Sequence, residues 1–253
     1  MLLFNIIHFT KKLIVTTGLV CIISSEMFSK GLPKEYYEIS DVNESKKYFF
    51  DYLYKLIEKE NKSIIKERNF ISSFLNKNIL SIDFDSLEFK KFLQIKKKYK
   101  ISKLFDIKSF MKKIDIIPPS QALAQAATES GWGRSRFIKE ANNIFGHWTY
   151  NPSIGMLPED RTIGATHFIR IFKSLQASIS AYMLNLNRNL AYKTFRDKRY
   201  TQRLKNKHPD GLHLSQTMLN YSGIAEEYLK ILKDIIQIND LHKYDKKFYQ
   251  QIN

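Results

Sequence analysis

Hydrophobic residues recur at helical spacing along much of the first half of the chain. From residue 44 to 75 they fall roughly on one stripe that repeats every three to four positions, and this predicts a long amphipathic helix. A polar stretch at 61–63 is a candidate bend or break in that helix. The residues of the stripe are Phe49, Leu53, Leu56, Ile57, Ile64, Ile71 and Phe74.

Two further helices are expected before the middle of the chain. Residues 82–100 are amphipathic, with Leu87, Phe92 and Ile95 on the inner face, and 105–116 form a shorter helix. No internal repeat or low-complexity segment is present. We therefore expect residues 44–116 to be a helical N-terminal region.

The pattern changes after Gly146. Residues 147–172 contain prolines, glycines and β-branched residues, and their end reads as a strand with Ile169 and Ile171 on one face. Helical spacing then returns twice, first after Ser174, a predicted N-cap, and again over Ala225–Ile238. The polar segment between these two helices, 199–215, is expected to be a loop or short helix. The order predicts an α+β fold that is mostly α-helical and has a small β-lobe.

The N-terminus has the order of a secretory signal. Lys11 and Lys12 precede the uncharged, largely apolar run 13–25, which is short for a membrane span. The apolar stretch at 2–9 lengthens it, so residues 1–26 are a signal peptide or, alternatively, an inner-membrane anchor formed by residues 2–25. Either reading predicts export to the periplasm or cell envelope.

Length and composition bound the rest of the chain. A chain of 253 residues is long enough for one domain of about 200 residues with accessory segments. Residues 27–43 read as a linker, and 241–253 as a C-terminal tail. The single cysteine, Cys21, lies within the signal, so the mature domain has no disulfide and depends on packing.

The formal net charge of +16 does not by itself identify a partner. The lysines are dispersed and no nucleic-acid-binding motif accompanies them, so we expect no nucleic acid partner. Either the charge reflects a lysine-rich composition, or it attracts the protein to an anionic envelope polymer. The six histidines are scattered without an HExxH motif, and no metal or cofactor is expected.

One carboxylate stands out as candidate chemistry. Pro118 and Pro119 suit a helix start, Gly131 suits its end, and Glu129 falls in the last turn between them. The negative pole of a helix disfavours an ionised acid there by about 0.3–1 kcal/mol, and exclusion of water would raise its pKa further. Such an acid stays protonated near neutral pH, as a general acid must.

The segment around Glu129 resembles a known family. ATESGWG at 127–133, followed by NNIFG at 142–146, is similar to the glucosaminidase family of peptidoglycan hydrolases, in particular its Bax-like branch. This is glycoside hydrolase family 73 of the lysozyme-like superfamily. The resemblance is densest over 117–150, returns at 164–192 and 217–230, and weakens back to about residue 45. It implies a lysozyme-like catalytic domain over 117–240 with the helical region as an N-terminal extension.

The resemblance also implies roles for particular residues. Glu129 matches the catalytic acid of the family, and Tyr221, in the late motif at 219–228, is placed near it. The family commonly takes a second acid from the β-lobe, yet 166–168 carries no carboxylate. If the β-lobe is shifted, Glu159 or its neighbour Asp160 serves, with Glu159 as the candidate; otherwise the protein works with one glutamate assisted by its substrate.

Aromatic and amide side chains complete the expected substrate-binding set. Trp132 and Trp148 are candidates for stacking on sugar faces, although Trp132 is also suited to forming a pocket wall. Asn143 and Phe145 are expected to shape the turn below the cleft.

The resulting hypothesis is an endo-β-N-acetylglucosaminidase that binds peptidoglycan glycan strands and cuts the β-1,4 bond after N-acetylglucosamine. A lytic transglycosylase, which leaves an anhydro product, is the nearest alternative. A non-hydrolytic cell-wall-binding relative is the other, because the β-strand acid is missing.

Overall fold

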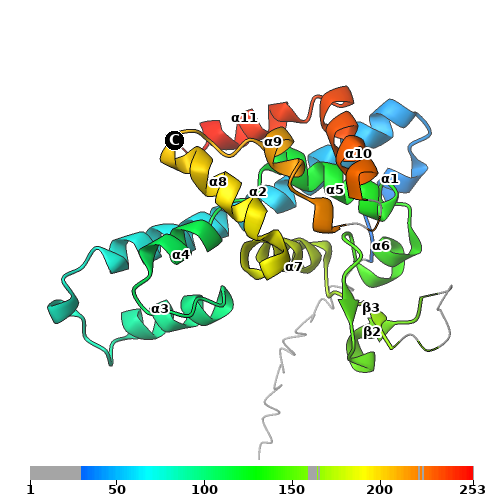
Figure 1. Ribbon diagram of the computed structural model, residues 1–253. Coiled ribbons are helices and arrows are strands. Elements are labelled where there is room, and N and C mark those ends of the chain that lie inside the picture. The colour runs from blue at the N-terminus through cyan, green and yellow to red at the C-terminus, as the bar shows by residue number, and fades with distance from the viewer. Residues whose placement is uncertain (1–29, 159–163, 165, 222, 224, 253) are drawn as a thin grey trace, which may run out of the picture.

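The computed structural model describes residues 30–158, 164, 166–221, 223 and 225–252 (Figure 1). The fold is mostly helical and contains one small antiparallel sheet, which confirms the predicted mostly helical α+β, lysozyme-like class. The α-helices are α1 (Lys34–Glu38), α2 (Val42–Leu75), α3 (Leu87–Lys98), α4 (Ile107–Lys113), α5 (Pro119–Ser130), α6 (Arg136–Ala141), α7 (Leu175–Arg188), α8 (Lys193–Leu204), α9 (Gly211–Ser215), α10 (Ala225–Ile238) and α11 (His242–Gln250). Short 3-10 turns lie at Ile79–Ser81, Pro152–Ile154, Leu190–Tyr192 and Leu219–Tyr221.

Helix α5 lies at the centre of the fold, in contact with α2, α9, α10 and α11. It begins at Pro119 and ends at Gly131, whose φ of 55° is left-handed, as the sequence predicted. Nearly all its side chains are buried, including four alanines and Leu123. Small side chains on all sides let several helices approach this one closely.

Helix α2 crosses the molecule without a break, so the candidate bend at 61–63 is not present. Asn61 is fully buried, and its side chain donates to the Ile117 carbonyl at 2.8 Å and accepts from the Ile117 N–H at 2.9 Å. The polar residue therefore pairs with the backbone just before α5, where it satisfies groups that would otherwise be buried without partners.

Helix α3 differs from its prediction at its start. Ser86 caps it by accepting from the Phe89 N–H at 3.1 Å, so Leu87 is the first helical residue. Leu87 is 83% exposed, and the prediction that it faces inward is wrong. Phe89 takes the inner position together with Phe92 and Ile95.

The β-lobe is a three-stranded antiparallel sheet in the order β1 (Trp148–Thr149), β3 (Phe168–Arg170), β2 (Gly155–Met156). Trp148 pairs with Ile169 and Gly155 with Arg170. Ile169 is buried, but Ile171 lies beyond the end of β3 and is 41% exposed, so the two do not share a buried face as expected. The strand stops because the Phe172 N–H leaves the sheet and donates to the Ala141 carbonyl of α6.

The segment expected to be a linker packs onto the domain instead. Within 27–43, the Gly31 N–H donates to Oδ1 of Asn142 at 2.9 Å, and Leu32 and Tyr36 are buried. The hydroxyl of Tyr36 donates to the Trp132 carbonyl. Apolar side chains within a short polar segment thus tie it to the end of the α5 turn.

The C-terminal tail is likewise part of the core. Helix α11 contacts α5, and its Asp245 accepts from the Ser120 N–H at 2.8 Å and from the Ser120 hydroxyl at 2.6 Å. Pro118, the N-cap residue of α5, has no side chain that can cap, so Asp245 supplies this interaction from a distant helix. A Cβ on Gly211 would lie 1.9 Å from the Ser120 hydroxyl, so only glycine fits beside the contact.

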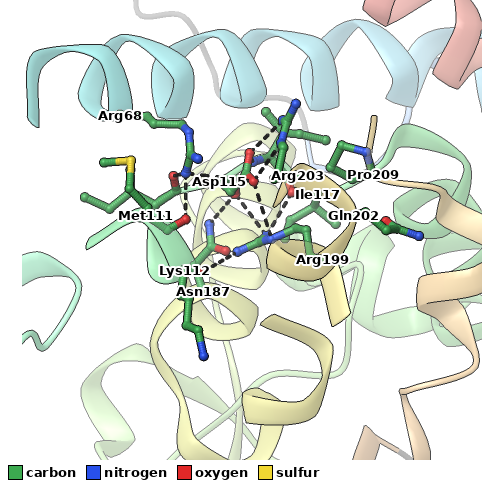
Figure 2. A network of polar contacts seen from close by, with 12 residues as sticks. Arg68, Met111, Lys112, Asp115, Ile117, Asn187, Arg199, Gln202, Arg203 and Pro209 are labelled. Atoms are coloured by element: carbon green, nitrogen blue, oxygen red, sulfur yellow. Dashed lines mark hydrogen bonds and ion pairs between the residues drawn. The ribbon is translucent and has the colours of Figure 1, made fainter. Parts of the chain in front are cut away.

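A second polar cluster joins helix α2 and the chain before α5 to helix α8 (Figure 2). Asp115, fully buried between α4 and α5, accepts from Arg203 at 2.8 and 3.0 Å and lies within 4.0 Å of both Arg68 and Arg199. Arg199 also donates to the carbonyls of Asp115, Ile116 and Lys112. The cluster thereby fixes the chain immediately before α5.

Within the described residues, no helix is long and apolar enough to cross a membrane. The predicted signal or anchor lies outside those residues.

Candidate active site

A cleft of about 1050 Å³ opens between the β-lobe, the end of α5 and one face of α7. Its α7 wall is a helical stripe, whereas Ile179, Tyr182, Met183 and Leu186 of the same helix face the core. The stripe consists of Ser180, Ala181, Leu184, Asn185 and Arg188.

Glu129 lies in the last turn of α5 and lines this cleft. Its Oε1 accepts a hydrogen bond of 2.7 Å from the Tyr228 hydroxyl of α10. Its Oε2 faces the turn at Gly146, where an added Cβ would lie 3.8 Å away. Burial raises the pKa of Glu129, and the bond from Tyr228 only partly opposes this.

Tyr228 is the last donor in a chain of hydrogen bonds in which each side chain donates to the next, toward Glu129. The Tyr182 hydroxyl donates to Oε1 of Gln125 at 2.5 Å, and Nε2 of Gln125 donates to the Tyr228 hydroxyl at 3.1 Å. Tyr228 consequently uses its own proton on Oε1 of Glu129. Because Oε1 already accepts this bond, Oε2, the oxygen at the Gly146 turn, is the one left to carry a proton.

Aromatic rings surround the acid. Phe145 stacks on Tyr182 with centroids 3.8 Å apart, and Tyr221 stacks on Tyr228 at 5.8 Å. Tyr221 lines the cleft as expected, but its hydroxyl donates to the Phe145 carbonyl at 3.4 Å. Burial first, and then nearby groups that include Glu129, raise the pKa of Tyr221 well above its ordinary value, so this phenol stays protonated.

The two tryptophans have different positions. Trp148 lines the cleft, is 62% exposed and stacks on His167 at 4.2 Å. Trp132 has a left-handed φ of 56° and packs on Phe50 of α2 at 5.4 Å, and it is not among the residues that line the cleft. The described geometry therefore leaves Trp148 as the accessible ring.

Asn143, which the sequence predicted to shape the turn below the cleft, lies at the base of the β-lobe. Its Nδ2 donates to the carbonyls of His147 at 2.8 Å and Arg170 at 2.9 Å, and its Oδ1 accepts from the His147 N–H. One buried amide thus holds the turn that follows Phe145 against strand β3.

The predicted second carboxylate, Glu159, lies outside the described residues. Among the described residues that line the cleft, the other carboxylate is Glu60 of α2, which accepts from the Ser180 hydroxyl.

Sequence reasoning missed both Glu60 and Tyr228. Glu60 is separated from the rest of the site by a long stretch of chain and has no motif of its own. Tyr228 ends the motif at 219–228, and its helical spacing to Leu232 and Ile236 was the available signal.

Comparison with known proteins agrees with this geometry. The family model described as mannosyl-glycoprotein endo-β-N-acetylglucosaminidase, Glucosaminidase, matches residues 105–241, more than half of the chain. "Protein bax" of Escherichia coli (strain K12) is 28% identical over 199 residues, which cover 77% of this chain and 69% of that protein. No solved structure matches. These matches confirm the resemblance drawn from the sequence, and the chain belongs to the glucosaminidase family of glycoside hydrolases.

Proposed function

We propose that the protein is an exported peptidoglycan hydrolase that cleaves the β-1,4 bond after N-acetylglucosamine, with Glu129 as the general acid. The observation that carries the proposal is a carboxyl group in the cleft whose pKa is raised by burial and whose Oε1 accepts from Tyr228, which leaves Oε2 as the oxygen for proton transfer. Family membership supports a glycosidic substrate, and the predicted signal supports access to the cell wall.

In this mechanism, Oε2 of Glu129 gives its proton to the glycosidic oxygen as the bond from that oxygen to the sugar C1 breaks. The positive charge that develops at the sugar ring is then next to a carboxylate that has just become anionic. Tyr228 stabilises this anion through the bond to Oε1, which is stronger when its acceptor is charged. Trp148 offers a ring face on which a sugar can stack.

The completion of the reaction needs a nucleophile at C1. We retain Glu159 as the candidate base for an attacking water, on the sequence argument. The acetamido group of the substrate is the alternative nucleophile if Glu159 has no role. The two differ in what Glu159→Gln does: hydrolysis falls by a large factor in the first case and is nearly unchanged in the second.

Digestion of purified peptidoglycan tests the reaction itself. The wild type is expected to release fragments with reducing N-acetylglucosamine ends, identified by mass spectrometry, and Glu129→Gln to release almost none. Anhydromuramic ends would instead identify a lytic transglycosylase. Absence of release by the wild type would favour a non-hydrolytic wall-binding protein, and equal release by the variant would remove Glu129 from its role.

A further inference from the structure

The cleft extends well past Glu129, toward a region that the family model does not cover. Helix α7 runs from the side of the β-lobe toward α3 (Figure 1). Ser178, near its start, accepts from the Ile144 N–H at 3.1 Å, whereas Arg188, at its end, donates to the Lys98 carbonyl of α3 at 3.3 Å. Eight residues of helix separate Ser180 from Arg188, or about 12 Å along the axis.

The far end of the cleft is charged, and most of its charges are already paired. Lys98 forms an ion pair with Glu67 at 2.7 Å, and Glu60 accepts from Ser180. Both Lys98 and Glu60 precede the segment 105–241 that matches the family. The N-terminal helices therefore contribute directly to the wall of the cleft.

Arg188 is the exception among these charges. Its contact with the Lys98 carbonyl uses one of five N–H donors, and among the described residues no carboxylate pairs with it. One turn earlier on the same face, Asn185 uses its Oδ1 to accept from Asn189 at 3.1 Å, which leaves its amide hydrogens available. The guanidinium and this amide form a group of donors that is suited to an anionic oxygen pair.

The chemistry of the proposed substrate narrows what this group can bind. The β-1,4 backbone of peptidoglycan carries hydroxyl and acetamido groups and no charge once its lactyl groups are amide-linked to peptide. The peptide branches, in contrast, carry free carboxylates. A planar guanidinium matches a carboxylate through two parallel hydrogen bonds.

We infer that Arg188, assisted by Asn185, is a subsite for a carboxylate of the peptide branch, so that the enzyme favours peptide-bearing glycan. This inference rests on the proposed function for its substrate, and it assigns a specificity role to the end of α7. Arg188 is a binding residue in this view and takes no part in proton transfer.

Paired substrates test the subsite. Initial rates of reducing-end release are compared on intact peptidoglycan and on glycan strands stripped of peptide by an amidase, whose freed lactyl carboxylates are then converted to methylamides so that the strands carry no charge. Arg188→Ala is expected to lower kcat/KM about tenfold on intact peptidoglycan and less than twofold on stripped strands, and Arg188→Lys to recover part of the loss. Lys198→Ala removes an exposed cation of α8 outside the cleft and should match the wild type on both substrates.

A binding measurement separates this inference from the proposed function. In a Glu129→Gln background, calorimetry is performed with a disaccharide-tetrapeptide and with the same disaccharide whose lactyl group ends in a neutral methylamide in place of the peptide. Arg188→Ala should weaken only the first interaction, by about tenfold, whether or not the protein cleaves peptidoglycan. Equal loss on both ligands or substrates, or loss on neither, would overturn the subsite, while thermal unfolding verifies that each variant is folded.

Discussion

Two carboxylates close to the two ends of α5 show how environment decides the use of an acid. Asp115 precedes the helix and is fully buried, whereas Glu129 is in its last turn and partly buried. Burial acts to raise the pKa of both. Around Asp115, the charges of Arg199, Arg68 and Arg203 outweigh burial and lower the pKa overall (Figure 2). Among the described residues, the group that hydrogen-bonds to the Glu129 carboxylate is the Tyr228 phenol, and the pKa stays raised.

The difference separates Asp115, which holds the fold together through its arginine partners, from Glu129, which the proposed mechanism uses as the acid. Asp115 stays ionised because three neighbouring arginines lower its pKa, and it is not among the residues that line the cleft. Glu129 lines the cleft, burial raises its pKa, and no cation of the described residues forms an ion pair with it. The type of neighbouring group, arginine beside Asp115 and phenol beside Glu129, therefore distinguishes the two sites better than depth of burial does.

The largest expected effect comes from removing the proton donor. Glu129→Gln should reduce the rate of glycan cleavage by about 10³-fold, or about 4 kcal/mol, because general acid catalysis contributes on this order. The free energy of unfolding should not fall, since the amide avoids the cost of a desolvated carboxylate. Steady-state release of reducing ends and urea unfolding measure the two quantities.

Glu140→Gln is the matched control, because Glu140 is an exposed acid on the neighbouring helix α6. It should leave both quantities unchanged. If Glu129→Gln is active, Glu129 is not the general acid. If it fails to fold, Glu129 has a structural role like that of Asp115.

The next effect falls on stability. Asp115→Asn should lower the free energy of unfolding by about 3 kcal/mol, because it leaves buried arginines without a counter-charge. Asp197→Asn makes the same change in a surface pair with Lys112 and Lys193 and should cost less than about 1 kcal/mol. Similar losses in the two variants would show that the Asp115 cluster is no anchor.

The pH dependence of that loss has a definite sign. The pKa of Asp115 is lowered from its ordinary value of 3.8, so its contribution is present above pH 3.8 and disappears as pH falls through the folded value. The stability gap between wild type and Asp115→Asn should thus be constant near neutral pH and should close in acid. Urea unfolding across the acidic range measures this gap.

The third expected effect is smaller and concerns the Tyr228 hydroxyl. Tyr228→Phe removes the hydrogen bond that opposes the raised pKa of Glu129, so the pKa rises further and the alkaline limb of the kcat/KM profile moves to higher pH. The maximal rate should fall about tenfold through the lost stabilisation of the anion.

Tyr182→Phe provides the comparison for this effect. It leaves the Tyr228 bond in place and removes only the far donor to Gln125, so its shift should be smaller. An alkaline limb that moves to lower pH in Tyr228→Phe would contradict the assignment of Glu129 as the titrating acid.

Local signals in the sequence identified elements whose ends are set by a few neighbouring residues. The stop at Gly131, the cap at Ser174 and the helix Ala225–Ile238 were all predictable, because a glycine, a hydroxyl or an apolar stripe acts within one or two turns. The motif around Glu129 was recognisable for the same reason.

Partners that approach from distant parts of the chain were not predictable. Nothing near Glu60 or Arg188 marks them as cleft residues, and their position depends on how α2 and α7 pack. Leu32 and Asp245 were assigned to a linker and a tail because their segments are short and polar. Their burial follows from one apolar contact and one capping contact, which periodicity does not reveal.

The bond from Asp245 to Ser120 has a consequence for how the protein folds. The two residues are 125 positions apart, so this hydrogen bond at the start of the helix that carries Glu129 forms only when a very large loop has closed. Contacts of such high order slow folding and form late. Helix α5 thus receives its full set of contacts only when nearly the whole polypeptide is complete, and a chain ending before α11 would keep the described residues that line the cleft but would lack the Asp245 contact.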